Sequence, residues 1–129
     1  MESLFTNAIH NSKNENIMSL TYAIINKRKH KILSELNLLS MKDKLKEYRH
    51  VDELHEIRTG CFIRWFNLST QLFANGGFIV RVDIEANGPL ITCKNQFNKF
   101  FTIQLNECII FQKITQQEHV LLSAMEHLA

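Results

Sequence analysis

The sequence predicts an α+β fold, because the spacing of its apolar residues changes twice along the chain. Up to about residue 57, apolar residues recur every three or four positions, as on a helix buried along one side. From Gly60 to Lys113 they alternate in short runs separated by turn residues, which is typical of antiparallel strands. A capping-box sequence at Thr115 then begins one last helix.

We therefore expect a single domain with a helical part at 1–57, an antiparallel β-unit at 58–113 and a capping helix at 115–129. The helical part is expected to be an N-terminal arm or hairpin, and the β-unit a five- to six-stranded antiparallel sheet or a small barrel. The chain has 129 residues, of which 45% are hydrophobic and 22% charged, as in an ordinary globular protein.

The helical part contains one clear amphipathic stripe. It is preceded at 1–12 by a weaker pattern of one or two helical turns, formed by Leu4, Phe5, Ala8 and Ile9. The stripe itself consists of Ile17, Leu20, Ile24, Arg28, Ile32, Leu36 and Leu39. Ser40 followed by Asp43 marks a break, after which a shorter helix is predicted from Met41, Leu45 and Tyr48. Residues 50–57 fit either the tail of a helix or a first, exposed strand.

The β-unit is predicted as a meander of short strands at 61–66, 71–73, 78–84, 90–94, 100–105 and 108–113. The turn Asn75-Gly76-Gly77 requires a positive φ, and the turn at 86–89 makes 90–94 the hairpin partner of 78–84. A further hairpin is expected between 100–105 and 108–113. In the strand at 78–84, alternation places Phe78, Val80, Val82 and Ile84 on one face, with Arg81, Asp83 and Glu85 on a solvated face.

Residues 1–18 are polar and lack the apolar core of about 7–15 residues that defines a signal peptide. No run approaches the roughly 20 apolar residues of a membrane span. We expect an intracellular protein, in the cytoplasm or nucleus, with no membrane partner. Cys61, Cys93 and Cys108 are widely spaced and odd in number, so they are predicted to be buried free thiols in a reducing compartment.

Basic residues gather between positions 27 and 49, where eight cations face three acidic residues for a local net charge of +5, against +2 for the whole chain. The cations are Lys27, Arg28, Lys29, Lys31, Lys42, Lys44, Lys46 and Arg49. A basic helix of this kind can contact nucleic-acid phosphates through counterion release. The alternative interpretation is a solvated helix face, which is what most charge runs are.

Aromatic and basic residues also alternate in the β-unit, at Arg64, Trp65, Phe66, Lys94, Phe97, Lys99, Phe100 and Phe101. They could form a stacking surface for a single strand, but we favour the interpretation that these rings are core, because nine Phe in this length must mostly be buried. The neighbours Phe100 and Phe101 cannot both face inward on one strand. One of them is expected on a second face, covered by a helix or a partner.

The sequence shows no motif for catalysis, a cofactor or a metal. The cysteines stand alone on separate strands, and the histidine pairs His50/His55 and His119/His127 lack the spacing of zinc ligands. The carboxylates Asp52, Glu53, Glu56, Asp83 and Glu85 fit solvated or edge-protecting charges better than acid–base catalysts. We therefore predict no catalytic residue, no metal ligand and no cofactor, although a site assembled from distant residues stays open.

Three segments carry a resemblance to a known group of proteins: the strand Gly60-Cys61-Phe62-Ile63-Arg64-Trp65-Phe66-Asn67-Leu68, the pair Gly76-Gly77, and the strand Cys108–Lys113. Together, over about the last 70 residues, they make the chain resemble small proteins of large eukaryotic DNA viruses. The resemblance implies a virion component or an accessory protein of the host cytoplasm. It implies no site residue.

These observations favour a non-enzymatic structural or interaction protein that acts in a larger assembly, with a protein partner or through self-association. The alternative is a nucleic-acid-binding module that uses the basic helix at 27–49. A small enzyme is the third class, and it would need a pocket where histidine and carboxylate or cysteine converge.

Overall fold

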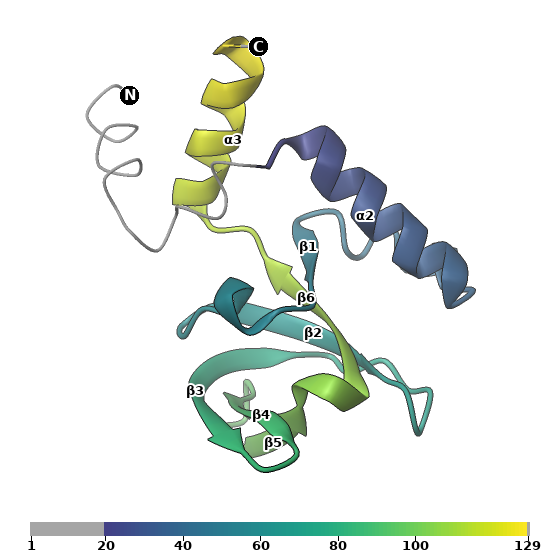
Figure 1. The fold of residues 1–129 in the computed structure, drawn as a ribbon, viewed down its shortest axis with the longest axis vertical. Helices are drawn as coiled ribbons and strands as arrows, with labels where there is room; N and C mark the ends of the chain where they lie inside the picture. Colours follow the sequence, from purple (N-terminus) through teal and green to yellow (C-terminus); the bar gives the residue numbers. More distant parts are fainter. Residues whose placement is uncertain (1–19, 129) are drawn as a thin grey trace. The chain divides into compact units, whose positions relative to one another are not determined.

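The structure, a computed structural model, describes residues 20–128 and confirms the α+β prediction (Figure 1). The helices are α2 (Tyr22–Glu35) and α3 (Gln116–Leu128), with short 3₁₀ turns η3 (Leu39–Met41), η4 (Leu54–Glu56) and η5 (Leu105–Glu107). The strands are β1 (Tyr48–Val51), β2 (Phe62–Asn67), β3 (Gly77–Glu85), β4 (Gly88–Lys94), β5 (Phe100–Gln104) and β6 (Cys108–Lys113). The helical turns expected at 1–12 and the start of the stripe at Ile17 lie outside the described residues.

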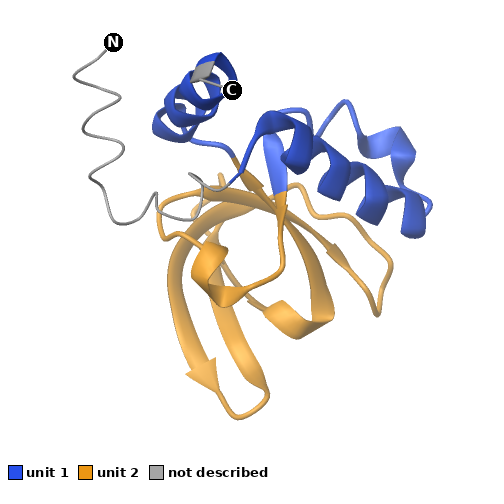
Figure 2. Cartoon of the chain, turned by 45° about the horizontal axis from the view of Figure 1, so that its top comes forward, with its two compact units in different colours: residues 1–49, 114–129 blue, residues 50–113 orange. Residues whose placement is uncertain are grey.

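The chain divides into two compact units, shown in different colours in Figure 2. Unit 1 comprises residues 1–49 and 114–129, and unit 2 comprises residues 50–113. Strand β1 begins at Tyr48, within the part predicted to be helical at 1–57, and the boundary between the two units falls after Arg49.

Helix α2 of unit 1 begins at an N-cap, since the Thr21 hydroxyl accepts a hydrogen bond from the Ile24 amide at 3.2 Å. Its buried residues are Ile25, Lys29 and Leu33, spaced four apart, whereas Ile24 is exposed. The predicted stripe through Ile24 was therefore wrong by one position. The cause is Lys29, a charged residue that occupies the middle of the buried face.

The shorter helix predicted from Met41, Leu45 and Tyr48 is also wrong. Helix α2 ends at Glu35, followed by Asn37 in the left-handed region at φ 57°, and residues 42–47 form turns. The carbonyl of Leu45, within these turns, and that of Tyr48, at the start of β1, accept hydrogen bonds from the Lys29 side chain. Of the two alternatives left open for 50–57, the strand is observed only as far as Val51, which is buried and not exposed.

Helix α3 begins as the capping box predicted. The Glu118 amide donates to the Thr115 hydroxyl at 3.1 Å, and the Glu118 carboxylate accepts from the Thr115 amide at 2.9 Å. Its buried face supplies Leu121 and Leu122, which pack with Ile25 and Ile114 in a small core within unit 1.

The six strands form one open antiparallel sheet in the order β1-β6-β2-β3-β4-β5, so the sheet alternative holds and the barrel does not. The meander from β2 to β5 and the pairing of β4 with β3 are as predicted. The hairpin predicted between 100–105 and 108–113 is wrong. The 3₁₀ turn η5 buries Leu105 and separates the two strands, and β6 pairs with β2, with Trp65 opposite Ile110. The strand predicted at 71–73 is reduced to a single bridge between Phe73 and Phe66.

A register shift in β3 reverses the face assigned to several of its residues. Ile79 pairs with Cys93 and Arg81 with Thr92, so Val80 is an extra residue, as in a β-bulge. Ile79 is buried, whereas Phe78, Val80 and Ile84 are exposed, contrary to the prediction. Only Val82, of the predicted inward set, packs against the core. The bulge switches the inward face partway along the strand, and a strict alternation cannot represent this.

The core of unit 2 lies on the inner face of the sheet and includes Ile63, Ile79, Ile91 and Ile110. The prediction of buried free thiols is confirmed for Cys61, Cys93 and Cys108. Burial, with Cys108 nearby as the second cause, raises the pKa of Cys93 to about 11. Cys93 therefore stays a protonated, apolar thiol at neutral pH.

Candidate binding site

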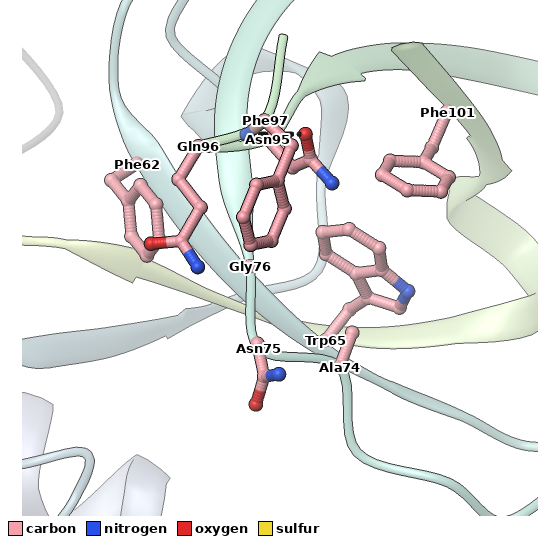
Figure 3. Close-up of a pocket in the computed structure, with 9 residues that line it drawn as sticks. All are labelled: Phe62, Trp65, Ala74, Asn75, Gly76, Asn95, Gln96, Phe97 and Phe101. Atoms are coloured by element: carbon pink, nitrogen blue, oxygen red, sulfur yellow. Dashed lines mark hydrogen bonds between the residues drawn. The ribbon is translucent and has the colours of Figure 1, made fainter. Parts of the chain in front are cut away.

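Unit 2 contains a pocket of about 350 Å³ with four aromatic rings in its wall (Figure 3). Strand β2 supplies Phe62 and Trp65, the turn between β4 and β5 supplies Phe97, and β5 supplies Phe101. Strands β3 and β4 lie between β2 and β5 in the sheet and curve strongly (Figure 2), and the four rings line one space (Figure 3). The remaining lining residues are Ala74, Asn75, Gly76, Asn95 and Gln96.

The turn at 95–99 that carries Phe97 is held by one asparagine. The Asn95 side-chain oxygen accepts from the amides of Phe97 at 2.9 Å and Lys99 at 3.0 Å, as in an Asx turn. Because the oxygen is engaged, the side-chain nitrogen is the group of Asn95 that faces the pocket, and it extends toward Trp65 in Figure 3. The pocket thus offers an oriented hydrogen-bond donor beside an indole ring.

Gly76 forms a wall that no other residue can provide. Its φ is +117°, and a Cβ there would lie 2.6 Å from the Ile63 carbonyl oxygen and 2.7 Å from the Phe62 ring. The glycine therefore allows the 74–76 segment to approach β2 closely.

We expect Gly76→Ala to lower the free energy of unfolding by about 2 kcal/mol, because it adds a backbone clash to the strain of a left-handed φ. Gly60→Ala is the matched control. Gly60 also has a positive φ, of +87°, but a Cβ there meets open space, so only the strain of about 1 kcal/mol is expected. Equal losses for the two variants in denaturant unfolding would contradict the close approach at Gly76.

A row of side chains crosses the outer face of four neighbouring strands and adjoins the pocket. Phe62 pairs with Phe78, Phe78 with Lys94, and Lys94 with Phe100, and cross-strand partners share a face. We call these four residues the aromatic row. The rings of Phe62 and Phe78 meet edge to face at 5.0 Å, and the Lys94 ammonium lies 5.9 Å from the centre of the Phe100 ring. Phe62 belongs to both the row and the pocket.

The favoured interpretation of the β-unit aromatics as core is wrong for three of them. Phe97 is 71% exposed and Phe100 62%, and Phe101 is also exposed. Trp65 and Phe66 are buried, as expected, although Trp65 also lines the pocket. Phe100 and Phe101 lie on opposite faces of β5, opposite Lys94 and Cys93 respectively, and the described residues cover neither ring.

Strands β4 and β5 and the turn between them contain Lys94 and Lys99 and no aspartate or glutamate. Strand β2 adds Arg64, whereas β3, which supplies Phe78, contains Arg81 together with Asp83 and Glu85. Arg64 donates to the Ala74 carbonyl at 3.1 Å and lies over the Phe73 ring, and Arg81 pairs with Asp83 at 2.8 Å. Lys94 and Lys99, at the two ends of the 95–99 turn, are thus the cations next to Phe97.

Two of the eight residues predicted to contact phosphates are buried and cannot do so. Lys29 is 3% exposed, and its ammonium donates to the carbonyls of Leu45 (2.9 Å), Lys46 (3.4 Å) and Tyr48 (2.9 Å). Burial, with Lys42 as the second cause, lowers the pKa of Lys29.

Arg49 is likewise buried, and its guanidinium lies 3.4 Å from the carboxylate of Glu118, which is 1% exposed. Neither role was predictable from the sequence, because both depend on contacts with residues distant along the chain. Six of the predicted residues keep surface exposure: Lys27, Arg28, Lys31, Lys42, Lys44 and Lys46. They do not form one helix, since the first three lie on α2 and the last three in the turns at 42–47.

A cluster of Tyr22, His119 and Glu47 lies within unit 1. The Tyr22 hydroxyl is 2.6 Å from Nδ1 of His119, and Nε2 of His119 is 3.7 Å from the Glu47 carboxylate. Tyr22 also packs against the core of unit 1, and its ring is tilted against His119 at 5.8 Å. We assign the cluster a structural role, joining the start of α2 to the start of α3.

Within residues 20–128, no three histidine, cysteine or carboxylate side chains come together in a way that could hold a metal ion. None of the helices in that part of the chain is long and apolar enough to cross a membrane. Comparison with protein-family models, curated proteins and solved structures found no match.

The sequence missed the polar part of the pocket. Asn75 and Gly76 were predicted only as turn residues, and no binding role was predicted for Asn95 or Gln96. The available signal was the clustering of turn residues and aromatics at 95–101, which predicts exposed rings as well as a turn.

Proposed function

We propose that this protein is a non-enzymatic binding protein whose recognition site is the aromatic pocket of unit 2, working within a larger assembly. The observation that carries the proposal is the exposure of Phe97, Phe100 and Phe101 around a cavity of about 350 Å³. Large exposed aromatics cost solubility, and grouped on a concave surface they are typical of a binding site.

The chemistry of the lining supports binding over catalysis. The nine lining residues include no histidine, cysteine or carboxylate, so the pocket lacks the groups that acid–base or nucleophilic catalysis uses. The resemblance to small proteins of large eukaryotic DNA viruses and a place in a virion remain predictions that fit a binding protein.

The proposal is tested with the full chain and three ligand classes: single-stranded oligonucleotides, proline-rich and aromatic peptides, and the chain itself by light scattering. The single tryptophan of the chain, Trp65, lines the pocket and provides a fluorescence signal. At least one class should give a saturable response that Phe97→Ala removes. Ile84→Ala, at a 70% exposed apolar residue outside the pocket, should retain it. No response to any class, or equal loss in both variants, would contradict the proposal.

A second candidate is phosphate binding by the exposed lysines of unit 1, favoured by Lys27, Lys31, Lys42, Lys44 and Lys46 lying at the surface. Its signature is affinity for duplex and single-stranded nucleic acid alike, falling steeply with salt. Lys27→Glu with Lys31→Glu should then weaken binding of every sequence and reduce the salt slope by about one per contact removed. Binding that is insensitive to this double change would exclude the candidate.

A further inference from the structure

We propose that the pocket takes an unpaired base of a single-stranded nucleic acid, with the neighbouring nucleotides running over the aromatic row. This inference rests on the proposed function, because it names the ligand class of the same site. It places the contact with nucleic acid on unit 2, and not on the basic residues at 27–49.

The pocket has the chemistry that an unpaired base requires. Its wall holds rings from Phe62, Trp65, Phe97 and Phe101 in a space large enough for a planar heterocycle. Every base presents a flat π-face that stacks on aromatic side chains. The amides of Asn95 and Gln96 supply hydrogen-bonding groups at the side of the same space (Figure 3), where the edge of a stacked base would lie.

The charge of the site selects a polyanion over the other ligands of aromatic pockets. A quaternary ammonium or a basic peptide would meet Lys94 and Lys99 at the two ends of the turn that carries Phe97, and these like charges repel it. A proline-rich peptide would gain nothing from Lys94 and Lys99. Phosphates on either side of a bound base would be attracted to these two lysines, which flank the turn of Phe97.

The aromatic row extends the same chemistry beyond the pocket. It sets Phe78 and Phe100 on either side of Lys94, on adjacent strands about 4.8 Å apart. Rings that alternate with a cation can stack bases while the ammonium contacts the backbone. Trp65 and Phe101 lie on the opposite face of the sheet from the row, so a strand that leaves the pocket passes Phe62, which belongs to both surfaces, to reach the row. A duplex cannot use this arrangement, since its bases are already stacked on both sides.

The experiment measures binding of labelled eight-nucleotide oligo(dT) and oligo(U), and of a duplex of the same length, to the full chain by anisotropy and by quenching of Trp65. We expect saturable binding of the single strands with quenching, and at least tenfold weaker binding of the duplex. The oligo(dT) and oligo(U) arms distinguish DNA from RNA.

Variants then locate the site. Phe97→Ala and Phe100→Ala should each weaken binding about tenfold, and Lys99→Gln should reduce the salt slope by about one contact. Ile84→Ala and the pair Lys27→Glu with Lys31→Glu are controls that should change neither the affinity for the single strands nor the salt slope. Circular dichroism confirms that each variant is folded.

Three results would overturn the inference: no binding of either single strand at low salt, duplex binding as tight as single-strand binding, or a loss confined to the Lys27/Lys31 variant. If single strands fail but a peptide quenches Trp65 and Phe97→Ala abolishes that signal, the inference is wrong and the proposed binding function stands. If no ligand class responds, both fail.

Discussion

Replacing Glu118 by alanine is expected to lower the free energy of unfolding by about 4 kcal/mol. One carboxylate oxygen accepts from the Thr115 amide in the capping box, and the other faces the guanidinium of Arg49 at 3.4 Å. Losing an N-terminal cap interaction costs about 1 kcal/mol. Removing one partner of a buried ion pair costs about 3–5 kcal/mol, because the other charge stays desolvated. The measurement is denaturant unfolding followed by the far-ultraviolet circular dichroism of the helices.

Two matched variants separate the components of this loss. Glu118→Gln keeps an oxygen for the Thr115 amide but removes the charge opposite Arg49, so it should lose less than the alanine variant. Glu126→Ala changes an exposed glutamate of the same helix and should change stability by no more than about 0.5 kcal/mol.

The paired change Arg49→Met with Glu118→Leu should be less destabilising than the sum of its single changes, because a buried apolar pair needs no charge partner. If Glu118→Ala and Glu126→Ala lowered the free energy of unfolding equally, the buried pair of Arg49 and Glu118 would contribute nothing to stability.

The features that were predictable from the sequence are those set by neighbours in the chain. The cap of α3 needs only Thr115 and Glu118, and the hairpin of β3 and β4 needs only the turn at 86–89. The incorrect predictions each depend on distant contacts. Strand β6 pairs with β2, which is distant along the chain, and not with the preceding β5, and the faces of β3 depend on a bulge at Val80.

The candidate site shows the same division. The sequence located the aromatic residues and the turns that hold them, but it assigned most of the rings to the core. Which rings are exposed depends on the curvature of the sheet, which brings Phe101 of β5 toward Trp65 of β2 across two intervening strands. The prediction for Lys29 was wrong in the opposite sense, because it placed a buried side chain at the surface. A lysine is expected in water, and only the carbonyls of residues 45–48 explain why this one is inside.

Lys29→Met is expected to lower the free energy of unfolding by about 3 kcal/mol, although methionine keeps most of the apolar stem. The ammonium of Lys29 donates to the carbonyls of Leu45, Lys46 and Tyr48. The Leu45 carbonyl keeps the Tyr48 amide as a donor at 3.0 Å. Each acceptor that is left without a donor costs about 1–3 kcal/mol, part of which is offset because the variant buries no charge. Lys27→Met, at an exposed position of the same helix, is the control and should change stability by less than about 0.5 kcal/mol.

The pH dependence of the stability difference between the wild type and Lys29→Met tests independently whether the Lys29 ammonium is buried. Burial lowers the pKa of Lys29 below its ordinary value of 10.5. Between the lowered pKa and 10.5, the unfolded chain binds a proton that the folded chain has released, so unfolding becomes less favourable as pH rises. The wild-type chain and Lys27→Met share this gain, whereas Lys29→Met lacks it. The stability difference between the wild type and Lys29→Met should therefore widen as pH rises toward 10.5 in urea titrations. A difference that stays constant or narrows would show that the Lys29 ammonium is not desolvated in the folded chain, and that its three carbonyl contacts are exposed to water.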